Sequence, residues 1–112
     1  MSVKIVAMLK ALPGLSREDF LTYWQQEHPA LVWQLPGLRT YRQNPAIEHR
    51  KSWPYDGMAE LYFDTVDDVR TAFASPQAEP LHEHEQHFLD TIDWFIATET
   101  TVEPVGETGT VR

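Results

Sequence analysis

The segment GMAELYFD, residues 57–64, constrains the fold more than any other part of the sequence. It is rich in residues that favour strands, and the side chains of an extended strand alternate between two faces. One face would carry Ala59, Leu61 and Phe63, and the other Met58, Glu60 and Tyr62. Because both faces carry large apolar groups, the sequence predicts a sheet that is covered on both sides.

The rest of the chain supplies strands and helices in the order β-α-β-β-α-β. Strands are predicted at 3–9, 38–44, 57–63 and 93–101, one long helix at 16–35, helical segments at 65–73 and 76–90, and a loop at 45–56. This order is typical of an α+β, ferredoxin-like protomer with a four-stranded antiparallel sheet and both helical segments on one face. A second copy on the open face is the simplest cover, so a homodimer is expected. The domain is predicted to span 1–102, with a polar tail at 103–112.

Capping residues set the predicted helix ends. Ser16 with Asp19 and Thr65 with Asp68 have the spacing of helix N-caps. Ser75 followed by a proline has the pattern of a third N-cap.

Composition excludes several classes of function. The 112 residues include no cysteine, which excludes disulfides and thiolate chemistry. The formal net charge is −8, from 17 acidic and 9 basic residues without a basic run, which argues against nucleic-acid binding. No segment approaches the roughly 20 apolar residues of a membrane helix, and we expect a cytoplasmic protein that does not bind membranes.

The stretch WQQEHPALVW, residues 24–33, places a histidine on the predicted long helix directly before a proline. At about 100° per residue, Phe20 and Trp24 define an apolar stripe, Glu27 lies near its centre and His28 lies at its border. Pro29 cannot donate a backbone hydrogen bond, so the helix is expected to bend or restart there. His28 is then either a buried histidine satisfied by a nearby backbone group or a catalytic group aimed into a cavity.

Other polar and aromatic side chains are candidates for the same site. Tyr41 and Asn44 follow on the next strand but on opposite faces, and His49 and Trp53 lie in the loop after it. Glu60 needs a partner if its strand is covered. Packing in the sheet also explains Tyr41 and Tyr62.

Familiar cofactor motifs are missing from the sequence. The run HEHEQH, residues 82–87, has no pair of histidines four residues apart, as an HExxH zinc motif requires. We expect a solvated helix face there, with no metal. The chain also has no glycine-rich phosphate loop, nucleophile elbow or haem-attachment motif, so no cofactor is expected.

Two long segments resemble the EthD family of small dimeric α+β-barrel proteins. They are GLSREDFLTYWQQEHPALVWQLPGLRTYRQN and DGMAELYFDTVDDVRTAFASP, and the similarity extends from about Val3 to Thr101. The resemblance implies relatives among polyketide decarboxylases and dehydratases, proteins of ether-degradation gene clusters, methylmuconolactone-type isomerases and cofactor-free monooxygenases. It also implies catalytic roles for His28, Tyr41 and, through a poorer local match, His49.

Two hypotheses follow. In the first, the chain is a cofactor-independent enzyme in which His28 moves a proton on a hydrophobic or aromatic polyketide- or lactone-like metabolite, as a decarboxylase, dehydratase or isomerase. The expected substrate-binding residues are Trp24, Asn44, Trp53, Glu60 and Tyr62. In the second, the chain is a non-catalytic ligand-binding or accessory dimer that supports a partner oxygenase. Haem handling, as in related barrel dimers, is a third reading.

Overall fold

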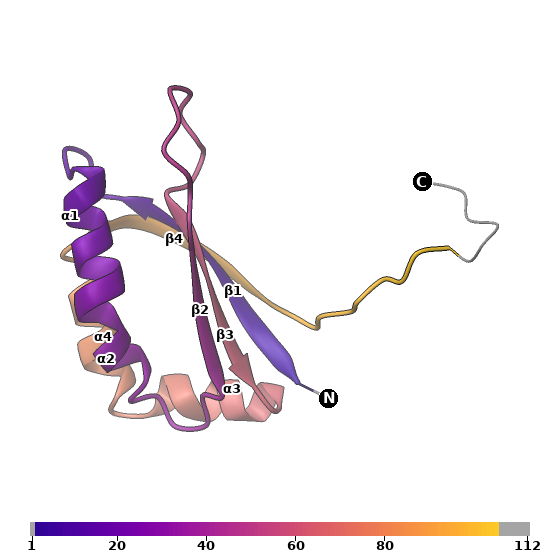
Figure 1. The fold of residues 1–112 in the computed structure, drawn as a ribbon. Coiled ribbons are helices and arrows are strands. Elements are labelled where there is room, and N and C mark those ends of the chain that lie inside the picture. Colours follow the sequence, from indigo (N-terminus) through magenta and orange to yellow (C-terminus); the bar gives the residue numbers. More distant parts are fainter. Residues whose placement is uncertain (1, 106–112) are drawn as a thin grey trace.

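The computed structural model describes residues 2–105, which form one antiparallel sheet with helices on one face (Figure 1). The strands are β1 (Val3–Ala11), β2 (Thr40–Pro45), β3 (Gly57–Phe63) and β4 (Leu89–Ala97), in the sheet order β2-β3-β1-β4. The helices are α1 (Arg17–Leu21), the π-helical turn η1 (Thr22–Glu27), α2 (His28–Val32), α3 (Val66–Ala74) and α4 (Ala78–Glu85). The predicted ferredoxin-like α+β architecture is confirmed.

Alternation along the strands separates the two faces that the sequence predicted, and the structure shows which of them carries the core. Ala59, Leu61 and Phe63 of β3 are buried, and the residues between them are half-buried. The pairing of β1 with β3 aligns Ala7 with Ala59 and Ile5 with Leu61, so that the buried side chains share the helix-covered face. The largest fully buried side chains lie beneath the helices: Phe20, Trp24, Phe63 and Phe88.

Two of the three predicted caps are confirmed. The Ser16 hydroxyl accepts from the Asp19 N–H at 3.0 Å, and the Thr65 hydroxyl accepts from the Asp68 N–H at 3.1 Å. The predicted N-cap at Ser75 is wrong. Its hydroxyl donates to the Ala72 carbonyl at the end of α3, and a turn leads to α4, which starts at Ala78.

The second half of the chain corrects two predicted boundaries. Helix α4 ends at Glu85 instead of residue 90, and β4 runs from Leu89 to Ala97 instead of 93–101. The physical reason is the long pairing with β1, which extends from Ala11 opposite Leu89 to Lys4 opposite Ala97. Because β4 starts at Leu89, the preceding residue Phe88 lies in the core, where it is 0% exposed.

The remaining segments extend beyond the sheet. The loop between β2 and β3 protrudes past one end of these strands, and the chain after β4 leads away from the body (Figure 1). The predicted tail is described as far as residue 105, and residues 106–112 lie outside the described part. Within residues 2–105, no helix has the length and apolar character needed to cross a membrane.

Gly57, at the start of β3, lies against the indole of Trp24. A Cβ at this position would lie 2.6 Å from Cζ3 and 2.7 Å from Cη2 of Trp24, which is 1% exposed. We predict that Gly57→Ala lowers the free energy of unfolding by about 1–3 kcal/mol because the methyl overpacks the core. Urea denaturation of the two proteins measures this difference.

Trp24→Phe provides the matched background for that test, because it removes the ring atoms that the new methyl would meet. Gly57→Ala should cost less stability in the Trp24→Phe protein than in the wild type. Equal stability of Gly57→Ala and wild type would contradict the described contact.

Candidate functional site

A cavity of about 630 Å³ lies between the helix-covered face of the sheet and the helices. Its walls are mainly apolar and come from all four strands and from η1, α2, α3 and α4. Trp94 of β4 lines it while remaining 61% exposed, so the cavity reaches solvent beside this edge strand. The polar residues that line it are His28, Tyr41, Arg70, His82 and Glu85. A mainly apolar pocket with a few polar groups is typical of a small-molecule site.

The π-helical turn decides which side chain of the first helix faces this cavity. The N–H of His28 donates to the carbonyl of Tyr23, five residues earlier, so the turn contains one residue more than an α-helical turn. Because of this extra residue, His28 takes the position around the helix axis that Glu27 would have in an ideal α-helix. His28 is therefore buried, at 5% exposure, and Glu27 is on the surface, which corrects the predicted stripe.

His28 contacts two residues of α4 through its two ring nitrogens. Its Nδ1 lies 2.9 Å from Nδ1 of His84, and its Nε2 lies 3.7 Å from a carboxyl oxygen of Glu85. Burial, together with the positive charges that His84 and His82 can carry, lowers the pKa of His28 to about 4. The imidazole is therefore neutral near neutral pH, and its hydrogen-bond partner is a second imidazole where the sequence suggested a backbone group.

Glu85 has the opposite response to the same environment. Burial raises its pKa to about 7, because the charged carboxylate loses hydration in the cavity wall. Close to neutral pH, the site thus holds a neutral imidazole beside a carboxyl group whose protonation burial favours.

Tyr41 approaches the cavity from β2. Its hydroxyl accepts a hydrogen bond from Nε2 of Gln43 at 2.7 Å, and the same amide donates to the Trp24 carbonyl at 2.8 Å. Burial raises the pKa of Tyr41 to about 12, so the phenol keeps its proton. Tyr41 can therefore donate a hydrogen bond within the cavity. Trp24 lines the same cavity, so the structure brings three of the predicted residues together with Glu85: His28, Tyr41 and Trp24.

His49 and Trp53 lie elsewhere, in the loop between β2 and β3. They line a second cavity of about 320 Å³ together with residues of β1 and α1. The His49 ring lies 5.3 Å from the Trp53 ring, and its Nδ1 accepts from the Lys51 N–H at 3.0 Å. The structure does not bring these two residues to His28.

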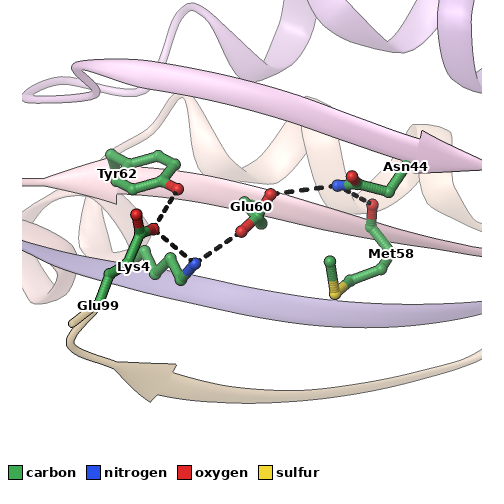
Figure 2. A network of polar contacts seen from close by, with 6 residues as sticks. All are labelled: Lys4, Asn44, Met58, Glu60, Tyr62 and Glu99. Atoms are coloured by element: carbon green, nitrogen blue, oxygen red, sulfur yellow. Dashed lines mark hydrogen bonds and ion pairs between the residues drawn. The ribbon is translucent and has the colours of Figure 1, made fainter. Parts of the chain in front are cut away.

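Asn44, Glu60 and Tyr62 lie on the sheet face away from the helices, where they join a polar network (Figure 2). Glu60 accepts from Lys4 at 2.6 Å and from Asn44 at 3.2 Å, and Glu99 accepts from both Lys4 and Tyr62. These contacts supply the partner that the carboxylate of Glu60 requires. The network is separated from the cavity by the sheet, so these three predicted substrate-binding residues do not line it.

His84 and Glu85 are the two partners of His28 that the sequence analysis missed. Both belong to the HEHEQH run, for which a solvated helix face was the expectation, but their side chains are only 15% and 20% exposed. They lie three and four residues after the buried Leu81, with the buried Phe88 seven residues after it. This spacing places them on the inner face of a helix and could have identified them. Within the described chain, no group of three or more potential ligands is arranged to hold a metal ion.

The fold and this cavity define a small ferredoxin-like protein with a mainly apolar cavity between its sheet and its helices. Residues 12–92 match the EthD domain, and the chain belongs to the EthD family, as its sequence predicted. The chain matches no curated protein sequence.

Solved structures with this fold come from several bacteria. An EthD family protein of Bacillus halodurans superposes with a TM-score of 0.76 at 20% identity, covering 89% of this chain and 100% of that one. SnoaB of Streptomyces nogalater, a cofactor-independent oxygenase, superposes with a TM-score of 0.66 at 15% identity, covering 93% of this chain and 98% of SnoaB. A dimeric ferredoxin-like protein of unknown function from Bacteroides fragilis superposes with a TM-score of 0.66 at 15% identity, covering 85% of this chain and 93% of that one.

The raised pKa of Glu85 and the lowered pKa of His28 predict opposite effects on stability. Between about pH 4.5 and 7 the folded chain keeps a proton on Glu85 that the unfolded chain has lost, so Glu85 lowers the free energy of unfolding as pH rises. Between about pH 4 and 6.5 the folded chain lacks a proton that unfolded His28 binds, so His28 raises it. In the wild type, these two changes of the free energy of unfolding with pH offset each other.

Glu85→Gln removes the contribution of Glu85 to the pH dependence of the free energy of unfolding. We predict that its free energy of unfolding, relative to the wild type, rises by a few kcal/mol (roughly 1.4 kcal/mol per unit of pKa shift) from pH 4.5 to 7. Urea denaturation across this range measures the difference. Glu83→Gln, an exposed neighbour on α4, is the control and should follow the wild type. A Glu85→Gln protein that also follows the wild type would contradict the buried carboxyl group.

Proposed function

We propose that this EthD protein is a cofactor-independent enzyme that carries out proton transfer on a hydrophobic or aromatic metabolite. The reaction would be a decarboxylation, dehydration or isomerisation of a polyketide- or lactone-like compound. The observation that supports this most is the contact between Nε2 of His28 and the carboxyl group of Glu85, 3.7 Å apart in the wall of a mainly apolar cavity.

The two groups divide acid and base roles between them. Neutral His28 offers a nitrogen lone pair, and Glu85 titrates near the pH at which general acid–base catalysis is most effective. One group removes a proton from the substrate carbon next to a carbonyl, and the other returns a proton to the intermediate. A hydrophobic substrate that fills the cavity would displace water, which would otherwise compete for both protons.

Tyr41 and Trp24 complete the proposed site. The protonated phenol of Tyr41 donates to the oxygen on which negative charge develops, as in an oxyanion hole. Trp24 forms part of the wall against which a flat aromatic ring would pack. SnoaB, which shares the fold, is a cofactor-independent oxygenase, so this architecture can support catalysis without a cofactor.

The alternative is a non-catalytic dimer that binds a hydrophobic ligand or supports a partner oxygenase. The hydrogen bond between His28 and His84 favours this reading, because it satisfies one nitrogen of a buried histidine without assigning it any chemistry. In that case the same cavity would bind ligands without exchanging their protons.

Deuterium exchange in D₂O distinguishes the two functions. We predict that the wild type catalyses exchange of the C–H protons next to the carbonyl in some members of a panel of lactones and aromatic ketones, followed by NMR. His28→Asn should lower that rate by about 10²- to 10⁴-fold, the range for loss of a positioned base. Glu83→Gln, on the exposed face of α4, is the control and should keep the wild-type rate.

Binding of the same compounds without exchange would favour the alternative. It would appear as quenching of tryptophan fluorescence, because Trp24 and Trp94 line the cavity. Equal exchange rates for His28→Asn and wild type would remove His28 from the mechanism.

A homodimer is part of the same proposal. Two bacterial proteins that share the fold are described as dimeric. Phe95 of β4 lies opposite Val6 on the sheet face away from the helices and is 51% exposed in the single chain. A second copy packing sheet to sheet would bury this apolar surface.

Phe95→Asp tests the dimer. We predict that the wild type sediments at twice the chain mass and that the variant sediments as a monomer, because a carboxylate would lose its hydration in the interface. Circular dichroism shows whether the variant keeps its fold. A wild-type protein that remains monomeric at micromolar concentration would contradict the dimer.

A further inference from the structure

Three side chains form a hydrogen-bonded series from the cavity to the surface. Nδ1 of His28 lies 2.9 Å from Nδ1 of His84, and Nε2 of His84 lies 3.2 Å from a carboxyl oxygen of Glu27. The His28 side chain is 6% exposed, that of His84 15% and that of Glu27 52%. The series therefore starts in the cavity wall and ends at solvent.

When His84 is neutral, hydrogen-bonding rules fix the direction of each bond in this series. An ionised carboxylate can only accept, so His84 must donate to Glu27 through Nε2. A neutral His84 then has an unprotonated Nδ1 that accepts, and His28 must donate to it through its own Nδ1. Neutral His28 is thus left with an unprotonated Nε2, the nitrogen that lies beside Glu85.

We propose that Glu27 and His84 are positioning residues that hold His28 in the tautomer with a bare Nε2 and connect it to solvent for proton release. The inference rests on the proposed function, because it specifies which nitrogen of His28 acts as the base. Neither residue lines the cavity, so both act through His28.

The proton transfers balance along the series. Nε2 of His28 takes a proton from the substrate carbon, whose electron pair stays on the substrate as an enolate. The Nδ1 proton of His28 passes to Nδ1 of His84, and the Nε2 proton of His84 passes to Glu27, which exchanges it with water. Glu85 then protonates the enolate carbon and recovers its proton from Nε2 of His28. The reverse transfers through Glu27 and His84 return a proton to Nδ1 of His28, which restores the starting tautomer.

The local fold brings this series together from two helices. The π-helical turn sends the consecutive residues Glu27 and His28 to the surface and to the cavity. His84, on α4, spans the distance between them, with its ring stacked on that of His28 at 5.1 Å between centroids. Tyr23 and Phe88 also contact the His84 ring and limit its rotation.

Long-range ¹H–¹⁵N NMR of the histidine rings tests the tautomer without any substrate. Near neutral pH we expect His28 to be protonated at Nδ1 and unprotonated at Nε2. His84→Phe keeps a flat ring but removes the acceptor, and Glu27→Gln removes the charge that orients His84. Both should shift the His28 population toward the Nε2-protonated form. Glu83→Gln, at an exposed residue of α4 outside this series, is the matched control and should leave it unchanged.

The deuterium-exchange assay supplies the second measurement. His84→Phe should lower the exchange rate by roughly 10- to 100-fold, the range known for loss of a group that orients a metal-binding histidine, and Glu27→Gln by less. Wild-type His28 protonated at Nε2, or a His84→Phe protein with the wild-type exchange rate, would overturn the inference. The expected tautomer in a protein that exchanges no compound would instead refute the proposed function and leave the tautomer assignment intact.

Discussion

The π-helical turn at Thr22–Glu27 is the local feature on which the candidate site depends. Without the extra residue in this turn, the buried stripe of the helix would present Glu27 to the apolar cavity and leave His28 at its border. An ionised carboxylate there would face a large desolvation penalty. Such turns weaken the helix and occur frequently at functional sites. Here the turn brings a neutral, titratable ring into the cavity wall and moves the charge to solvent.

Burial has two opposite effects on the pair that faces the cavity. It disfavours the charged form of both groups, so it lowers the pKa of His28 and raises that of Glu85. The result is a His28–Glu85 pair without net charge between about pH 4 and 7, in which each group can still exchange a proton. A mainly apolar cavity is therefore compatible with acid–base chemistry because the same apolar walls set the protonation of both partners.

Much of the fold could be predicted from the sequence, whereas only part of the site could. Alternation in β3 identified its two faces, and capping pairs at Ser16 and Thr65 marked two helix starts. The end of α4 was missed because no glycine or proline separates Gln86 from Leu89, and pairing with β1 decides where the strand begins. His28 was found, but its partners were not. A wheel with a constant angle per residue cannot represent a π-helical turn, and contacts between two helices depend on tertiary packing.

Strand β4 has a consequence for how the single chain behaves. In the described sheet it has a neighbouring strand on one side only, and it carries exposed apolar side chains on both faces: Ile92, Trp94, Phe95 and Ile96. A nine-residue edge with free backbone donors and acceptors is a template on which another extended chain can add. Covering this edge by assembly would therefore protect the protein against aggregation, in addition to enclosing its apolar surface.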